Sequence, residues 1–176
     1  MSEGVEQLGL DFEVEQSAWG RWVDPRRRAA RAREFMNAAG LAEIPDQPWP
    51  PDWPETPRLD AYLAGLFPDL ATAMAPQNCR FADAFICFMG ECFIRYAGAR
   101  WVEYPWFGRG RSFYDEVNPA LEIDDADEDV FTAWGHMRDM IGHHTGGWGG
   151  MFAYFAESLI EYRGDHLDKR LHDPAR

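Results

Sequence analysis

One nearly unbroken apolar stretch, FADAFICFMGECFIRYAGARWV at residues 81–102, constrains the fold more than any other part of the chain. Its only charges before the glycine at position 98 are Asp83, Glu91 and Arg95, and helical periodicity places all three on one side. The rest of the circumference is almost wholly apolar, which is typical of a helix that other elements enclose. Gly98 suits the left-handed position that ends many helices. The stretch therefore predicts a buried helix followed directly by a strand.

From this stretch we expect an α+β fold that is predominantly helical, with helices packed around the central helix over 81–97 and a small antiparallel β-hairpin. The first hairpin strand is predicted over 100–104 and the returning strand over 112–116, with Asn118-Pro119 ending it. Further helices are predicted at 25–39, 57–67, 68–74, from about 130 to 141 and at 151–163. A length of 176 residues favours one well-buried domain.

The chain divides by composition into a core and its flanks. Residues 1–20 read as an acidic N-terminal tail, 21–165 as a single globular domain and 166–176 as a polar C-terminal tail. Within the domain, the Pro- and Trp-rich segment 45–57 is predicted to be an extended connector, which Trp49 and Trp53 hold against the domain's own surface.

The net charge of −13 bears on partners and compartment. An acidic surface repels phosphate backbones and anionic lipids, so it disfavours nucleic acid and membranes as partners and leaves open a basic protein. No apolar leader or spanning run stands out, and the three cysteines read as reduced, buried thiols, so we expect a soluble cytoplasmic protein. The strong preference for Arg over Lys suggests a GC-rich bacterial genome.

Tests for catalytic and cofactor motifs are negative. The Gly-rich loop at 142–150 lacks the G-K-[ST] ending of a phosphate-binding loop, and no G-x-S-x-G nucleophile elbow exists. His136 and Asp139 have the spacing of a ligand pair without an evident third ligand, so no metal and no cofactor is predicted. The six acids in Glu122–Asp129 lack the pattern of an EF-hand and are expected to cap the next helix. The Arg-rich start of the helix over 25–39 is expected to form a solvated face that pairs with the protein's own acids.

Six residues are the candidate binding residues. Glu91 and Arg95 are four apart on the central helix, and we expect them to form a largely buried pair near Trp101. The remaining three are His143, His144 and Trp148, which belong to the Gly-rich loop and are expected at its exposed tip. No residue is assigned a catalytic role.

The segments GECFIRYAGARWV and VNPALEI resemble a module that recurs in uncharacterised bacterial proteins, some of them immunity-like, toxin-neutralising partners. The matching positions are Gly90, Glu91, Arg95, Gly98, Arg100, Trp101, Val102, Asn118 and Pro119. Ala99 stands where the module usually has a second glycine. The resemblance covers about a fifth of the chain and implies a fold element and no catalytic activity.

Two functions follow as hypotheses. The first is a small, acidic, non-enzymatic cytoplasmic protein that acts by protein–protein interaction, as an immunity-type partner or otherwise. The alternative is an enzyme or small-ligand-binding protein that uses Glu91, Arg95 and the His143/His144 loop. A cavity where Glu91 meets a histidine would favour the alternative, and a flat acidic face would favour the first.

Overall fold

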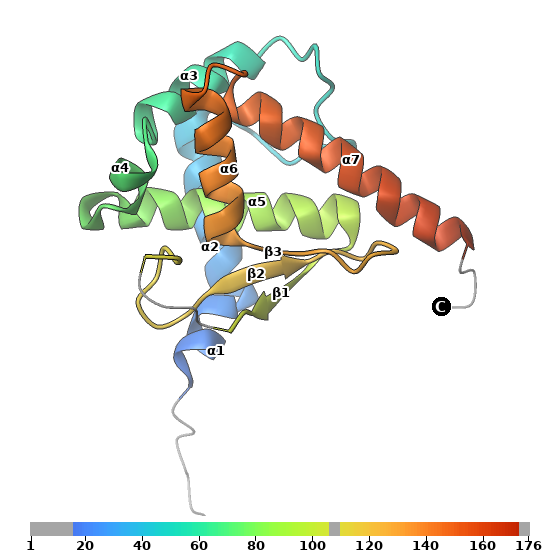
Figure 1. Ribbon diagram of the computed structural model, residues 1–176, viewed down its shortest axis with the longest axis horizontal. Coiled ribbons are helices and arrows are strands. Elements are labelled where there is room, and N and C mark those ends of the chain that lie inside the picture. Colours follow the sequence, from blue (N-terminus) through green and yellow to red (C-terminus); the bar gives the residue numbers. More distant parts are fainter. Residues whose placement is uncertain (1–15, 106–109, 173–176) are drawn as a thin grey trace, which may run out of the picture.

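The structure, a computed structural model, describes residues 16–105 and 110–172. It is mostly helical with one three-stranded antiparallel sheet, so the predicted helical α+β class is confirmed (Figure 1). The elements in chain order are α1 (Ala18–Val23), α2 (Pro25–Ala39), α3 (Thr56–Leu66), α4 (Leu70–Met74), the 3-10 turn η1 (Pro76–Asn78), α5 (Cys79–Ala97), β1 (Arg100–Glu103), β2 (Pro119–Glu122), β3 (Val130–Thr132), α6 (Ala133–Thr145) and α7 (Met151–His172).

Local signals set the ends of α2 and α5. The Asp24 carboxylate accepts hydrogen bonds from the backbone N–H groups of Arg26 and Arg27, and Pro25 occupies the first turn of α2. Gly40 ends that helix with φ +70° and Gly98 ends α5 with φ +59°, left-handed conformations that favour glycine. These boundaries therefore follow from short-range chemistry.

Helix α5 runs across the middle of the molecule, with α2 behind it and α6 crossing in front (Figure 1). Most of its residues are buried, and Phe85, Phe88 and Phe93 have no solvent exposure. From α2, Phe35 packs against Phe85 and Phe88 with ring centroids 4.9 and 4.8 Å away. From α7, Phe155 lies 5.9 Å from both Phe88 and Phe93.

The proline-rich segment lies on this core as predicted. Trp49 is only 4% exposed, and its ring lies 5.2 Å from Phe152 of α7 and 6.1 Å from Phe88 of α5. Trp53 packs beside it with its ring tilted by 38° and ring centroids 5.8 Å apart. The two tryptophans supply the apolar contact that a segment without a hydrogen-bonded ladder needs.

The sheet corrects the predicted hairpin. The returning strand is Pro119–Glu122 and not residues 112–116, and β3 adds a third strand, in the order β1-β2-β3. The Ser112 hydroxyl donates to the Val117 carbonyl at 2.8 Å and accepts from the Tyr114 N–H at 3.1 Å. These local bonds fold residues 112–117 into turns. Pro119 begins β2 instead of ending a strand, a position where its missing N–H is tolerated.

The acidic run also differs from its prediction. The run connects β2 to β3. It does not cap α6, because β3 lies between the run and the first residue of that helix, Ala133. The Thr132 hydroxyl caps α6 by accepting from the Gly135 N–H at 3.0 Å. Within the run, Asp125 accepts from the Asp129 N–H at 3.0 Å and closes the turn.

The flanks carry more helix than predicted. Helix α7 does not end at Gly164 but continues to His172, because Asp124 holds its last turns. Lys169 Nζ donates to Asp124 Oδ1, and His166 Nδ1 contacts the Asp124 carbonyl, both at 2.8 Å. At the other end, α1 begins at Ala18, inside the segment predicted as tail, while residues 1–15 and 173–176 lie outside the described residues. No helix in the described ranges combines the length and apolar character needed to cross a bilayer.

Candidate ligand-binding site

Glu91 and Arg95 do not pair, so that prediction is wrong. Glu91 accepts from Arg28 of α2 at 2.8 Å, and Arg95 donates to Asp46 of the proline-rich segment at 2.5 Å. Their side chains are 29% and 45% exposed, because the polar side of α5 faces neighbouring elements that each supply an opposite charge. Both line a shallow groove of about 500 Å³, which Arg33 and Asp46 share and which no histidine lines.

The basic start of α2 pairs with internal acids, as the sequence predicted. Arg27 Nη2 lies 2.7 Å and Arg31 Nε 3.2 Å from Asp83 Oδ2 on α5. The buried Tyr114 hydroxyl donates to the other Asp83 oxygen at 2.7 Å. This cluster is structural: the carboxylate is 8% exposed, and every strong partner is a group of this chain. Beside it, burial raises the pKa of the Cys87 thiol to about 12, so Cys87 is no nucleophile.

Trp101 lies on β1 against α5, where a Cβ on Gly90 would come within 2.2 Å of the Trp101 ring. Its edge meets Trp22 of α1 with ring centroids 4.9 Å apart. Trp101 is therefore part of the packing between α1, β1 and α5, on the side of α5 where Glu91 also makes its contact with α2.

The loop residues lie elsewhere, at the end of α6. Trp148 is 79% exposed, and His143 and His144 are half-buried rather than at an exposed tip. The His143 ring lies 4.9 Å from Tyr154 of α7. The structure therefore does not bring the six candidate residues into one site. Glu91, Arg95 and Trp101 contact α2, the proline-rich segment and α1, whereas His143 contacts α7 and Trp148 is exposed.

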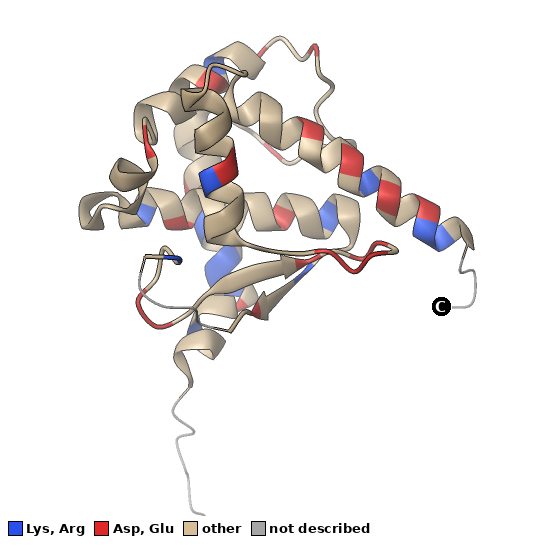
Figure 2. Cartoon of the chain, in the orientation of Figure 1, with Lys and Arg blue, Asp and Glu red and all other residues tan. Residues whose placement is uncertain are grey.

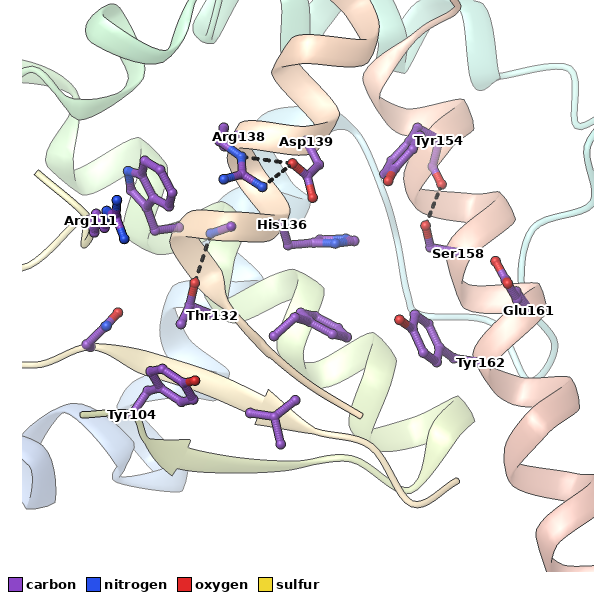
Figure 3. Close-up of a pocket in the computed structure, with 15 residues that line it drawn as sticks. Tyr104, Arg111, Thr132, His136, Arg138, Asp139, Tyr154, Ser158, Glu161 and Tyr162 are labelled. Atoms are coloured by element: carbon purple, nitrogen blue, oxygen red, sulfur yellow. Dashed lines mark hydrogen bonds and ion pairs between the residues drawn. The ribbon is translucent and has the colours of Figure 1, made fainter. Parts of the chain in front are cut away.

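A different pocket brings residues of three elements together. It has a volume of about 560 Å³ and lies between α6, α7 and the sheet (Figure 3). Its walls carry aromatic rings from all three elements, among them Phe131 of β3, Trp134 of α6 and Tyr154 and Tyr162 of α7. A volume of this order suits a small organic molecule.

His136 is the buried polar group of this cavity. It is 8% exposed, its ring stacks on Phe131 at 5.0 Å, and Phe93 meets it edge-on at 5.4 Å. Burial lowers the pKa of the imidazole to about 4, against a smaller opposing effect of Asp139, so His136 is neutral at physiological pH. Its Nε2 atom has no hydrogen-bond partner within the described residues. In Figure 3 the ring projects from α6 toward α7.

Helix α7 presents polar groups to the same space. Tyr154, Ser158 and Tyr162 follow one another at intervals of four residues and so share a face, with Glu161 beside them (Figure 3). The Ser158 hydroxyl donates to the Tyr154 carbonyl at 3.0 Å, within its own helix. No hydrogen bond of either tyrosine hydroxyl to a described residue is found, so both are free to bind a ligand.

The opposite end of the cavity is bounded by Asn118 and by a paired charge. Asn118 is 4% exposed, and its Oδ1 atom has no partner among the described residues. Arg138 donates twice to Asp139, at 2.7 and 2.9 Å, and its guanidinium lies 5.1 Å from the Trp134 ring. The pocket thus combines aromatic walls with two residues, Asn118 and His136, that each hold a buried polar atom without a partner among the described residues.

No three His, Cys, Asp or Glu side chains are placed to share a metal ion within residues 16–105 and 110–172. His136 has no carboxylate or nucleophile within hydrogen-bond distance among those residues, so the arrangement lacks the base–orienter pair of an acid–base catalyst. Its donors and acceptors suit recognition.

The sequence interpretation considered His136 only as a metal ligand and missed its partners on α7. A signal existed in the Tyr154, Ser158, Tyr162 spacing, since an aromatic and hydroxyl stripe on one helical face is unusual for a purely structural helix. The sequence gives no indication that α7 packs opposite His136.

Comparisons of the chain with protein-family models, with curated proteins and with solved structures found no match in any of the three.

Proposed function

We propose that this protein is a small-molecule-binding protein whose ligand occupies the cavity between α6, α7 and β3. The observation that carries the proposal is the buried His136, which lines a ring-walled pocket of about 560 Å³ and whose Nε2, closed off from solvent, has no partner among the described residues. An unpaired buried polar atom costs roughly 1–3 kcal/mol, so a ligand that pairs it gains affinity.

The experiment is a binding screen by 1H–15N NMR with mixtures of chemically diverse small molecules. A ligand of this cavity shifts the backbone amides of Thr132, Gly135 and Ser158, which line it from β3, α6 and α7. A screen in which no compound shifts these amides together contradicts the proposal.

A matched pair of variants separates cavity binding from surface binding. Ser158→Trp fills the cavity, because Ser158 faces it and makes only a bond within its own helix. Glu157→Trp adds the same ring at the neighbouring exposed position of α7, outside the cavity. Binding should be lost in the first variant and kept in the second. Equal binding by both would place the ligand elsewhere.

A second candidate function, protein–protein interaction with a basic partner, is favoured by Trp148. Its large apolar ring is 79% exposed on the α6–α7 loop, and exposed tryptophans are frequent energetic centres of interfaces. Figure 2 shows acidic residues gathered over the β2–β3 connection, while α7 carries acidic and basic residues interleaved. The acidic connection would speed association with a basic, immunity-type target. The test is the association rate with a partner captured from the host across a salt series. Trp148→Ala should raise the dissociation rate, and a salt-independent association rate would contradict a basic partner.

A further inference from the structure

We propose that the α7 half of the cavity binds an organic cation, with an ammonium or quaternary ammonium group seated among His136, Phe131, Tyr154 and Tyr162. The inference rests on the proposed function, since it names the class of ligand that the same cavity takes. It draws on three independent features: the balance of charge, the arrangement of the rings, and the state of the histidine.

The uncompensated charge in this half of the cavity is negative. Glu161 lines it from α7 and makes no ion pair with any described residue. Asp139 is already neutralised by Arg138 at 2.7 Å. Arg111 belongs to the opposite end, and Figure 3 shows it well separated from Glu161, Tyr154 and Tyr162. A cation in this half meets an unpaired carboxylate, while an anion would be repelled by it.

The pKa values of Tyr154 and Tyr162 are raised first by burial and further by nearby carboxylates. Burial raises the pKa of Tyr162 to about 12, and the carboxylates of Asp129, Glu161 and Asp125 act in the same direction. Burial also raises the pKa of Tyr154, again with help from carboxylates, those of Asp139 and Glu161. Acids on α6, α7 and the β2–β3 connection therefore act together on the space between the two hydroxyls.

Four aromatic rings line this half of the pocket and pack against one another. Phe131 lies 5.6 Å from Tyr162 and 5.0 Å from His136, and His136 lies 6.2 Å from Tyr154, all between centroids. Aromatic faces carry a negative quadrupole that attracts a cation within about 6 Å, and several rings around one site are the usual way to hold a quaternary ammonium group.

The neutral state of His136 removes the one cationic group that would oppose such a ligand. A neutral imidazole can present its ring to a cation without charge repulsion. The two tyrosine hydroxyls supply acceptors, since neither has a partner among the described residues. A compact cation therefore finds both acceptors and ring faces here.

The probes are two matched pairs that differ in charge and little in shape. Choline is compared with 3,3-dimethylbutan-1-ol, and n-butylammonium with n-butanol, by NMR titration at low ionic strength. We expect each cation to bind at least about tenfold tighter than its neutral counterpart, with shifts at Gly135 and Ser158. Raising the salt concentration should weaken only the cations.

Variants assign the effect to this half of the cavity. Glu161→Gln should weaken cation binding about three- to fivefold and leave the neutral alcohols unchanged. Tyr162→Leu, which keeps an apolar wall without a π face, should weaken it about fivefold. The control is Glu157→Gln, which removes an exposed carboxylate of the same helix outside the cavity and should have little effect.

The two proposals fail in different ways. If neutral compounds bind as well as the cations, or Glu161→Gln and Glu157→Gln act alike, the assignment to a cation is overturned. The same holds if neither cation binds while other compounds of the diverse screen still shift the cavity amides. If no compound of any charge shifts them, the ligand-binding function itself is overturned.

Discussion

Lowering the pH from 7.5 to 5 should destabilise the fold through His136. The residue is enclosed by Phe93, Phe131 and Tyr154, and no described group accepts or donates a hydrogen bond at its Nε2. Protonation would place a charge in that ring-lined pocket. Its pKa of about 4 in the fold expresses this cost, with Asp139 the only charge that reduces it.

The size of the effect follows from proton linkage. The pKa of an unfolded histidine is about 6.5, so between roughly pH 6.5 and pH 4 the unfolded chain binds more protons at His136 than the fold does. Stability is therefore complete above about pH 6.5 and falls as the pH drops through that window. Each pH step of one unit costs about 1.4 kcal/mol, which gives about 2 kcal/mol by pH 5 and about 3 kcal/mol by pH 4.

The assay is urea unfolding at the two pH values for the wild type and for His136→Phe, a ring that fits the aromatic surroundings. The wild type should lose about 2 kcal/mol more than His136→Phe between pH 7.5 and 5. His172→Gln, at an exposed position, serves as the control and should keep the full wild-type loss. Carboxylate titration is common to all three proteins and cancels in the difference. Equal losses in the wild type and His136→Phe would refute the reasoning.

Three further stability predictions are checked by the same unfolding measurement. Asp83→Ala leaves a buried tyrosine and two arginines without their acceptor and should cost about 3–5 kcal/mol, whereas Glu55→Ala, in an exposed ion pair, should cost less than about 1 kcal/mol. Gly90→Ala should cost about 1–3 kcal/mol, since its Cβ overlaps the Trp101 ring, and Gly142→Ala, which meets open space, should be neutral or stabilising. Phe88→Ala empties a site with no solvent exposure and should cost about 3–5 kcal/mol. A wild-type midpoint for any of the three costly variants would contradict its contacts.

Helix ends could be read from the sequence because their causes are local. Asp24-Pro25 and Thr56-Pro57 open α2 and α3, and Gly40 and Gly98 end α2 and α5 at the predicted positions. Where a residue distant in the chain determines a helix end, the prediction from local sequence was wrong. Helix α7 passes Gly164 because Asp124, forty residues away in the chain or more, binds its last turns.

The charged pairs and the site depended on tertiary placement. The i, i+4 spacing of Glu91 and Arg95 predicted that these two residues pair. In the fold, Arg28 of α2 pairs with Glu91 instead. Asp46 of the proline-rich segment pairs with Arg95. The cavity likewise needs β3, α6 and α7 together, and the sequence interpretation had replaced β3 with the first turn of a helix. The predicted returning strand failed because a side-chain hydrogen bond of Ser112 bends that segment, and the hydrophobic periodicity of a sequence does not reveal such a bond.

Ion pairs between α2 and α5 occupy arginines that could otherwise offset acids elsewhere on the molecule. The arginines Arg27, Arg28 and Arg31 are committed to Asp83, Glu91 and Glu34, so these bases do not offset acids elsewhere. Residues 127–129 and the glutamates of α7 make no ion pairs within the described residues, and Figure 2 shows them along the β2–β3 connection and α7. Of these unpaired acids, Glu161 lines the His136 pocket. The internal ion pairs that hold α2 on α5 therefore also help to set the negative field that would draw a cationic ligand to α7.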